Sequence, residues 1–429
     1  MDEYEIFIED HCDEMVEDLL DVVSIKSVKS KDEANFTFGK GVHEAMNRFE
    51  LLCQKLGLEN VHRYDDYYSW VEIGNPALPM VGIICHIDVV DFDPTQWRHN
   101  PLGELSNGII YGRGVSDDKG PLIMCLYAMK YIQDQKIPLR VRLIVGGDEE
   151  SDFLCAKKYI SNHEEMPRFG FIPDAKFPFI QAEKSLWNVT FQLTIEQFGY
   201  SDSSCLSGGI GQNSIPDQAK ITIKGKDHHF RGETGHAANF AQADNAILQL
   251  ISAIGPREDS LAEILVRHLS HQCLAIPYKD GEINLVPTWI QNKEDKIHVT
   301  FDMRIDESFD VSDVKRYLLK FLHLKEDDIV RENISQGYCY DLNHPVVDLL
   351  YTNYQECLRR SAVKRDPGRP MKIGGTTYAK SFPNCITYGP GFMNEHSYAH
   401  RADERISISS FKLAAYIYLR GLVSFQKLD

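Results

Sequence analysis

Carboxylates are concentrated in the segment GGDEESD (146–152), which directly follows the apolar run VRLIV (141–145). Four acidic side chains occupy five consecutive positions there, at the end of what we predict to be a buried strand. A solvated acidic loop would account for this charge, and a bound cation would account for it more specifically. Because neighbouring residues at a strand end project to opposite sides, Glu149 and Glu150 can do different work. One could bind a metal while the other accepts a proton.

A second group is Cys85-His86-Ile87-Asp88, at the end of another predicted strand. Residues two apart on a strand point to the same face, so His86 and Asp88 should lie together. A metal-binding histidine usually has its other ring nitrogen held by a carboxylate or a carbonyl, and this spacing supplies one. Taken alone, the motif is more often a structural histidine–aspartate pair.

A third group is GRGVSDDKGP (112–121), in which two adjacent aspartates precede a predicted helix. Asp118 is a candidate cap for the orphan amides of that helix, which Gly120-Pro121 would open. If Asp118 caps the helix, the cap does not account for Asp117, which is left without a structural role.

The fourth group is Pro173-Asp174, just after the predicted strand FGFI, and two histidines follow further along the chain. These are His236, in GETGHAANF, and His400, in SYAHRADERISI. Together the groups supply the parts of a dinuclear hydrolytic site: histidine and carboxylate ligands, a bridging carboxylate, and a free carboxylate beside a metal-bound water.

The elements that must position these residues alternate between strands and helices. Helices are predicted over 4–25, 42–56, 120–135 and 153–160, and strands over 69–74, 80–88, 139–147 and 169–175. Strands and helices that alternate at these lengths predict an α/β fold, with a mostly parallel sheet and helices on both faces. Such folds place their sites at the carboxyl ends of strands, where these groups lie.

The pattern changes after about residue 186, where strands such as KIHVTFDMRI (296–305) alternate apolar and polar side chains. One-sided antiparallel sheets show this alternation. The α/β pattern returns with a helix over 345–361 and with the C-terminal segment. A chain of 429 residues also predicts two domains. We therefore expect a discontinuous catalytic domain (1–186 and 345–429) and an inserted α+β domain (187–344).

Composition excludes several classes of protein. The 63 acidic and 46 basic residues give a net charge of −17, which argues against nucleic acid as a partner. No apolar stretch is long enough for a membrane span, and the acidic N-terminus does not resemble a secretory signal. The ten cysteines are scattered without a CxxC pair, as buried thiols in the cytoplasm would be.

Five motifs together resemble a family of di-metal peptidases: HIDVV, GRGVSDDKGP, GGDEES, PDA and AHRADE. The family includes aminoacylases, carboxypeptidase G, carnosinases and PepV-type dipeptidases. Three longer segments are most similar to the PepV type: FGFIPDAKFPFIQAEKS, SGGIGQNSIPDQAKI and GGTTYAK. The resemblance spans nearly the whole chain. It implies a phosphorylase/hydrolase-like catalytic domain and makes the inserted domain a lid.

The resemblance also implies roles for the candidate residues. One divalent metal, zinc or manganese with cobalt as a further option, would be held by His86, Asp117 and Asp174. The second would be held by Asp117, Glu150 and His400. Three ligand carboxylates, two divalent cations and one bridging hydroxide sum to zero charge. Asp88 would orient His86, Glu149 would be the general base, and the peptide bond between Asp117 and Asp118 would be cis.

Residues of the inserted domain and of the GGTTYAK segment are assigned to the substrate by the same resemblance. His236 would stabilise the oxyanion, whereas His228 and His229 are expected on the surface. Arg304 would bind the substrate α-carboxylate, with an ordinary surface arginine as the alternative. Thr377 and Asn213 lie in substrate-facing motifs.

The implied function is hydrolysis of the amide bond of dipeptides by a water that bridges the two metals. The alternatives are deacylation of N-acyl amino acids and, outside catalysis, a silent metal-binding protein. Thr376 departs from the family, which usually has a glycine there, and this bears on substrate choice. The inserted domain is also shorter than the PepV lid. This leaves open a monomer or a homodimer, with His236 acting within its own chain or on its partner.

Overall fold

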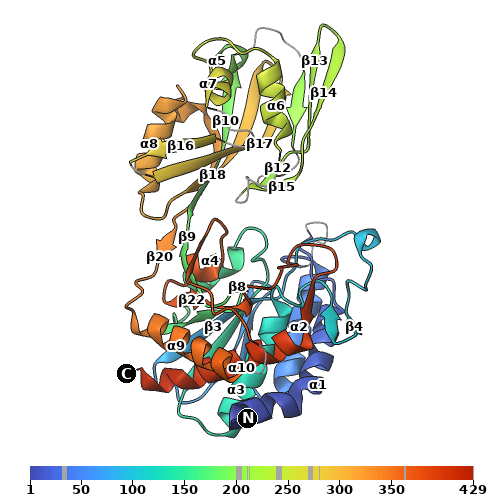
Figure 1. The fold of residues 1–429 in the computed structure, drawn as a ribbon, viewed down its shortest axis with the longest axis vertical. Coiled ribbons are helices and arrows are strands. Elements are labelled where there is room, and N and C mark those ends of the chain that lie inside the picture. Colours follow the sequence, from blue (N-terminus) through green and yellow to red (C-terminus); the bar gives the residue numbers. More distant parts are fainter. Residues whose placement is uncertain are drawn as a thin grey trace. The chain divides into compact units, whose positions relative to one another are not determined.

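The computed structural model describes residues 1–30, 36–199, 205–209, 211, 213–237, 244–268, 274–279, 281–361 and 364–428. The chain divides into two compact units (Figure 1). The first contains residues 1–181, 340–371 and 377–429, and the second contains residues 182–339 and 372–376.

Four parallel strands form the centre of the main sheet of the first unit. They lie in the order β6 (Arg140–Gly146), β3 (Met80–His86), β7 (Phe169–Ile172) and β22 (Cys385–Thr387). Every residue of β3 and β6 is buried. Because successive side chains of a strand point to opposite faces, both faces of this sheet are covered. The predicted α/β fold with helices on both faces is therefore confirmed.

Antiparallel strands extend this sheet at both sides, which the sequence did not predict. β2 (Tyr68–Ile73) and β1 (Val61–Tyr64) follow β6, and β9 (Ile180–Glu183) follows β22. The strands β8 (Ala175–Lys176) and β23 (Pro390–Gly391) pair nearby, in parallel, as a separate two-stranded sheet. The parallel order of the four central strands places the ends of β3, β6 and β7 beside one another.

Six helices of the described chain pack around the main sheet; five of them contribute buried residues to one hydrophobic core, while α4 (Leu154–Ser161) contacts β2 instead. The six helices are α1 (Glu3–Val23), α2 (Lys40–Lys55), α3 (Lys119–Asp134), α4 (Leu154–Ser161), α9 (Pro345–Arg360) and α10 (Ile408–Ser424). Helix α3 is almost entirely buried because it contacts β3 and β6 as well as α1 and α10. A helix that is apolar on all sides is typical of such an interior position.

A small antiparallel sheet joins two distant parts of the chain. Its strands are β4 (Glu104–Ser106), β5 (Ile109–Tyr111) and β24 (Arg405–Ser407), in the order β24-β5-β4. Arg405 pairs with Tyr111. This pairing brings the C-terminal loop that carries His400 to the segment that precedes Asp117.

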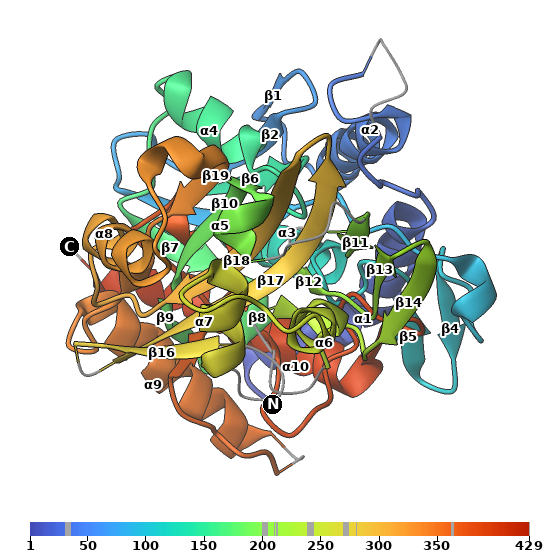
Figure 2. The ribbon, with the colours of Figure 1, turned by 90° about the horizontal axis from the view of Figure 1, so that it is seen from above.

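The second unit contains an eight-stranded antiparallel sheet with its own hydrophobic core (Figures 1 and 2). Its strands are β10 (Ser185–Thr194), β11 (Leu206–Gly208), β13 (Gln218–Ile223), β14 (Lys226–Arg231), β16 (Leu274–Tyr278), β17 (Gly281–Lys293), β18 (Lys296–Ile305) and β19 (Ile329–Ser335). Its helices are α5 (Ile195–Phe198), α6 (Ala246–Ala253), α7 (Leu261–Arg267) and α8 (Val311–Phe321). This is the α+β architecture that the sequence predicted for the inserted part.

Short pairs of strands complete the described structure of the two units. β12 (Ser214–Ile215) pairs with β15 (Gly235–His236), and β20 (Tyr338–Cys339) and β21 (Met371–Ile373) both pair with β9. No helix among the described residues is long and apolar enough to cross a membrane. Most of the described cysteines are buried, Cys205 and Cys339 are exposed, and Cys273 lies outside the described residues.

Candidate functional site

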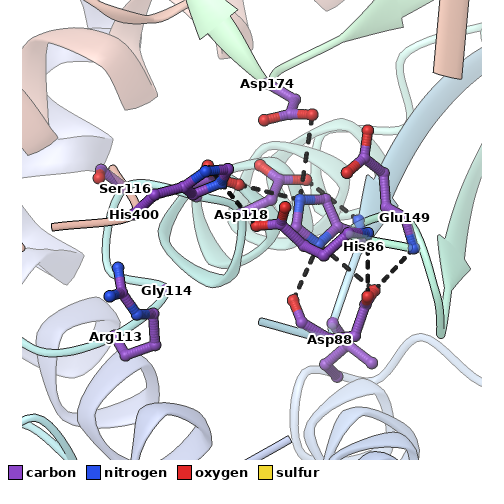
Figure 3. A network of polar contacts seen from close by, with 12 residues as sticks. His86, Asp88, Arg113, Gly114, Ser116, Asp118, Glu149, Asp174 and His400 are labelled. Atoms are coloured by element: carbon purple, nitrogen blue, oxygen red, sulfur yellow. Dashed lines mark hydrogen bonds and ion pairs between the residues drawn. The ribbon is translucent and has the colours of Figure 1, made fainter. Parts of the chain in front are cut away.

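The loops that follow three neighbouring parallel strands bring the candidate ligands to one edge of the sheet. His86 is the last residue of β3, Glu149 and Glu150 lie in the turn after β6, and Asp174 lies just after β7. Asp117 precedes α3, and His400 lies in the loop before β24. All six residues belong to the first unit, and their short distances to one another gather them in one cluster. His86, Glu149, Asp174 and His400 are labelled in Figure 3.

His86 is fully buried and both of its ring nitrogens have partners. Nδ1 lies 2.9 Å from the backbone carbonyl of Asp88, so an Nδ1–H donates to that carbonyl. Nε2 lies 3.0 Å from Asp117 Oδ1 and 3.9 Å from Asp174 Oδ2. A histidine held in this way through Nδ1 presents Nε2 to a metal.

His400 approaches Asp117 from the opposite side. Its Nε2 lies 3.1 Å from Asp117 Oδ2 and 2.9 Å from Glu150 Oε1. Asp117 therefore offers one carboxylate oxygen to each histidine. This division is the geometry that a carboxylate bridging two cations requires.

Two groups of ligand atoms within the cluster are close enough to surround an ion. The ligand atoms of His86, Asp117 and Glu150 lie within 4.8 Å of one another, and so do those of His86, Glu149 and Asp174. Glu149 and Glu150 thus belong to different groups. They do so from a turn and not, as the sequence suggested, as strand neighbours that point to opposite sides.

Asp88 holds the turn that carries these two glutamates. Its Oδ1 accepts the backbone N–H of Glu149 at 3.0 Å, and its Oδ2 accepts that of Glu150 at 3.1 Å. The Asp88 carboxylate also lies 3.5 Å from Nδ1 of His86. Asp88 thus connects the ligand at the end of β3 with the turn after β6.

Burial and crowding of like charges shift the acidity of the carboxylates. Burial raises the pKa of Glu149 and Asp174 well above their ordinary values. The negative charge of Asp174 adds to the shift in the pKa of Glu149, and that of Asp117 adds to the shift in the pKa of Asp174. Burial also raises the pKa of Glu150. Burial alone would raise the pKa of Asp117 as well, but hydrogen bonds from His400 and His86 lower it.

The pKa values of the two histidines are raised as well, but by their hydrogen bonds to carboxylates and not by burial. Burial favours neutral His86, yet its hydrogen bonds to Asp117 and Asp88 outweigh burial and raise its pKa well above the ordinary value. The pKa of His400 is likewise raised, because its bonds to Asp117 and Glu150 outweigh desolvation. Both imidazoles therefore respond to the concentrated negative charge of the cluster.

The composition of the cluster fits a divalent cation. In the part of the chain that the structure describes, the carboxylates of Asp117, Glu150 and Asp174 pair with the two histidines and with no lysine or arginine. Imidazole and carboxylate donors without a basic side chain are the set that zinc and related metals bind. The residues present therefore fit a metal site.

The model of peptidase family M20/M25/M40 matches residues 82–423, a range that contains every candidate site residue. The chain belongs to this peptidase family. The family resemblance noted from the motifs is thereby confirmed, and so is the assignment of the chain to the peptidases.

The chain is similar to several relatives and solved structures over nearly its whole length. "Putative dipeptidase YtjP" of Bacillus subtilis is 26% identical, with 97% of this chain and 98% of the relative aligned. "Putative dipeptidase SH1171" of Staphylococcus haemolyticus has the same identity and coverage. The solved structure of human carnosine dipeptidase 1 superposes with a TM-score of 0.60 at 14% identity, covering 99% of this chain and 98% of that one. The dipeptidase Dug1p of Saccharomyces cerevisiae has a TM-score of 0.63 at 13% identity, with the same coverage.

Asp118 does not cap α3, contrary to the prediction from the sequence of this M20/M25/M40 peptidase. It occupies the N-cap position, but its side chain makes no capping bond to the helix. Its Oδ2 instead accepts the backbone N–H of His86 at 3.1 Å, and its Oδ1 is buried with no hydrogen-bond partner among the described residues. The peptide bond between Asp117 and Asp118 is cis, as the family resemblance implied.

The two remaining carboxylates of GGDEESD have structural partners. Asp148 is buried and accepts the backbone N–H groups of Leu154 and Cys155 at the start of α4, so it acts as a helix cap. Lys29 lies 2.9 Å from Asp152 and 3.4 Å from Asp148. Sequence reasoning missed Lys29, because it lies more than a hundred residues away along the chain.

Three of the predicted substrate residues belong to the second unit. Asn213 is exposed, and its carbonyl accepts the N–H of Ala237. His236 pairs with Ser214 through its backbone, and its side chain lies outside what the structure describes. Arg304 is buried: it donates to both Asp302 carboxylate oxygens, at 2.6 and 2.8 Å, and also to a carbonyl of the GGTTYAK segment.

Thr377 is buried in the first unit and shares a hydrogen bond of 3.0 Å with Thr387. The predicted surface histidines His228 and His229 are exposed. Sequence reasoning also missed Glu404, which is buried beside the segment that precedes Asp117. Its place in the motif AHRADE was the available signal, but nothing in the sequence shows what it contacts.

Proposed function

We propose that this M20/M25/M40 peptidase is a metal-dependent dipeptidase that holds two divalent ions. The observation that carries the proposal is the placement of Asp117, whose two oxygens face two different histidines at 3.0 and 3.1 Å. Beside them, the Glu149 carboxylate is buried and has no hydrogen bond or ion pair with any described residue. The site thus combines a bridging ligand with an uncommitted carboxylate.

The proposed ligand sets are those that the family resemblance implies, and the contacts of Asp117 with His86 and His400 support them. His86, Asp117 and Asp174 would hold one ion, and Asp117, Glu150 and His400 would hold the other. When bound, two such ions polarise the scissile carbonyl and lower the pKa of a bound water. Imidazole and carboxylate donors suit zinc, manganese and cobalt alike, so the donor set supports zinc or manganese without selecting one.

Glu149 would be the general base and acid of the reaction. It would take a proton from the attacking water and later deliver it to the nitrogen of the leaving amine. Asp88 supports this role, because it fixes the backbone of Glu149 and also binds the ring of His86. A base held at this position can transfer a proton without a large rearrangement.

The substrate class rests on the family and on the names of the relatives, several of which are called dipeptidases. We therefore propose small peptides, dipeptides above all, as substrates. His236 as oxyanion donor, and Arg304, Thr377 and Asn213 as substrate contacts, stay predictions, as do the cytoplasmic location and the choice between monomer and homodimer.

A substrate panel tests this proposal. The purified chain, loaded in turn with zinc, manganese and cobalt, is given a set of dipeptides and a matched set of N-acyl amino acids. We expect dipeptides with a free amine to be cleaved fastest. Faster cleavage of N-acyl amino acids would replace the dipeptidase assignment by a deacylase. Metal binding without turnover of either set would make the chain a silent metal-binding protein.

A further inference from the structure

We propose that Glu404 is a positioning residue that fixes the position of Asp117 relative to His400. Glu404 is fully buried and lies in the motif AHRADE, four residues after His400. Its role depends on the ligand sets proposed above, because it acts on the two residues that would share the second ion. Among the described residues, the Glu404 carboxylate forms hydrogen bonds and an ion pair with Arg113, Gly114 and Ser116 and with neither of those two side chains.

The carboxylate of Glu404 is bound by the segment that leads directly into Asp117. Its Oε1 accepts the backbone N–H and the hydroxyl of Ser116, both at 3.0 Å. Its Oε2 accepts the backbone N–H of Gly114 at 3.1 Å and a guanidinium N–H of Arg113 at 2.7 Å. Both oxygens are thus used, and Ser116 is the residue immediately before Asp117. Figure 3 shows Arg113, Gly114 and Ser116 along one side of the cluster, near His400.

The backbone of Glu404 is tied to the same segment. Its carbonyl accepts the N–H of Gly112 at 3.0 Å, and the next residue, Arg405, pairs with Tyr111 in the small sheet. One glutamate therefore binds residues 112–116 through its main chain and through both carboxylate oxygens. These bonds fix the direction in which the chain enters Asp117.

The other side of this connection is the loop that carries His400. About half of the His400 side chain is exposed, and its ion-pair partners among the described residues are Asp117 and Glu150. Its backbone has a φ of +62°, a left-handed conformation that a non-glycine residue adopts only when its surroundings impose it. Asp403 anchors the same loop by accepting the N–H groups of Arg98 and His99. Glu404 then fixes the position of this loop relative to Asp117.

A charge pair with Arg113 alone would not explain the arrangement. Arg113 is buried and lies over the ring of Trp97, with 5.3 Å from the guanidinium carbon to the ring centroid. Three of the four donors to the Glu404 carboxylate nevertheless come from Gly114 and Ser116. These donors lie closer to Asp117 along the chain than Arg113 does. The carboxylate therefore orders the turn as well as neutralising an arginine.

The test is a cobalt titration of the metal-free full-length chain, followed by visible absorption and by the number of ions bound. Glu404→Gln keeps the size of the side chain, but its amide nitrogen must face N–H donors that now have no acceptor. We expect two ions in the unmodified chain. In Glu404→Gln the first ion should bind nearly as before, and the second should bind about 10–100-fold more weakly, as for other residues that orient metal ligands.

Glu72→Gln is the matched control, because Glu72 is also a buried glutamate that binds arginines, Arg140 and Arg142. Glu72 pairs with Arg142 on β6, four residues before Gly146, which places it about 13 Å from the strand end that carries the site. We expect Glu72→Gln to lower the melting temperature and to keep both ions. If Glu404→Gln does not fold, Glu404→Asp retains the charge for Arg113 but withdraws the carboxylate from Ser116. Glu404→Asp should weaken the binding of the second ion in the same way.

The outcomes separate the two proposals. Fewer than two ions in the unmodified chain would contradict the proposed di-metal site itself. Two ions there, with unchanged affinity for both in Glu404→Gln or in Glu404→Asp, would overturn the role of Glu404 alone. Equal weakening in the Glu404 and Glu72 variants would reduce Glu404 to a stabilising residue and would also overturn the proposal.

Discussion

The carboxylate of Asp88 accepts the backbone N–H of Glu149 at 3.0 Å, while the carbonyl of Asp88 binds the ring of His86 at 2.9 Å. One residue therefore positions a candidate metal ligand and the candidate base. The resemblance assigned Asp88 only the first of these tasks. The second arises because β3 and β6 are parallel neighbours, so that the loops after them meet.

Replacement of Asp88 by asparagine should disturb the base more than the metal. An asparagine offers one acceptor oxygen, so its amide nitrogen would face the N–H of Glu149 or Glu150. The backbone carbonyl that binds His86 is unchanged. We expect kcat to fall about 10–100-fold while the bound metal is retained. Steady-state kinetics together with the metal content of the same sample measure this, and an unchanged kcat would show that the turn does not need Asp88.

Glu149→Gln should separate metal binding from turnover. The glutamine keeps the shape of the side chain but cannot accept a proton from water. We expect kcat to fall by about 10²–10⁴ while the number of bound ions stays the same. Asp152→Asn is the control within the same acidic segment, because Asp152 is exposed and pairs with Lys29. Activity close to that of the unmodified chain in Glu149→Gln would make another residue the base.

Lys29 should stabilise the acidic turn although it is far from it in sequence. Lys29→Met would leave buried Asp148 without its cationic partner, although Asp148 would keep the N–H groups of Leu154 and Cys155. We expect the free energy of unfolding to fall by about 1–3 kcal/mol. Lys26→Met, which removes an exposed ion pair with Asp91, should cost less than about 1 kcal/mol. Equal losses in urea unfolding of the two variants would contradict the importance of the buried pair.

Asp2 should make stability depend on pH at the N-terminus. Burial raises the pKa of Asp2, but the N–H of Glu5, the hydroxyl of Tyr416 and two arginines outweigh burial and lower it below 3.8. Because folded Asp2 holds its proton less tightly than unfolded Asp2 does, its contribution is complete above 3.8 and declines as the pH falls below that value.

The corresponding variant is Asp2→Asn, compared with the exposed Asp10→Asn in the same helix. Near neutral pH we expect Asp2→Asn to lower the free energy of unfolding by about 1 kcal/mol, and Asp10→Asn by less than about 0.5 kcal/mol. Urea unfolding at several pH values should show the Asp2 difference shrinking in acid. A difference that grows as the pH falls would mean that the sign of the shift is wrong.

Much of this arrangement could be predicted, because the residues that can bind a metal or accept a proton lie at the ends of predicted strands. His86, Glu149, Glu150 and Asp174 each follow an apolar run, and parallel strands bring such positions to one edge of a sheet. The predicted helices match α1, α2, α3 and α4 within a few residues for the same reason, since their apolar spacing is regular. The structure brings these residues together, while their individual roles stay predictions.

Contacts between distant segments could not be predicted from the sequence. Glu404 meets Ser116 across 288 residues, through a sheet whose strands have only three residues each and leave no periodic signal. Asp118 was expected to be a cap because aspartate before a helix usually is one. The free N–H of His86 at the end of β3 takes that carboxylate instead. The buried backbone N–H of His86 needs a hydrogen-bond partner, and this need outweighs the local preference of aspartate for capping a helix.

The most direct test of the di-metal peptidase proposal is dipeptide hydrolysis by one preparation of the chain before metal removal, after removal and after restoration. The ligand sets around Asp117 predict that the metal-free chain stays folded but hydrolyses no dipeptide. They also predict that activity returns as a divalent metal refills the site, in proportion to the ions bound. Dipeptide hydrolysis that continues at full rate in the metal-free chain would contradict the proposal.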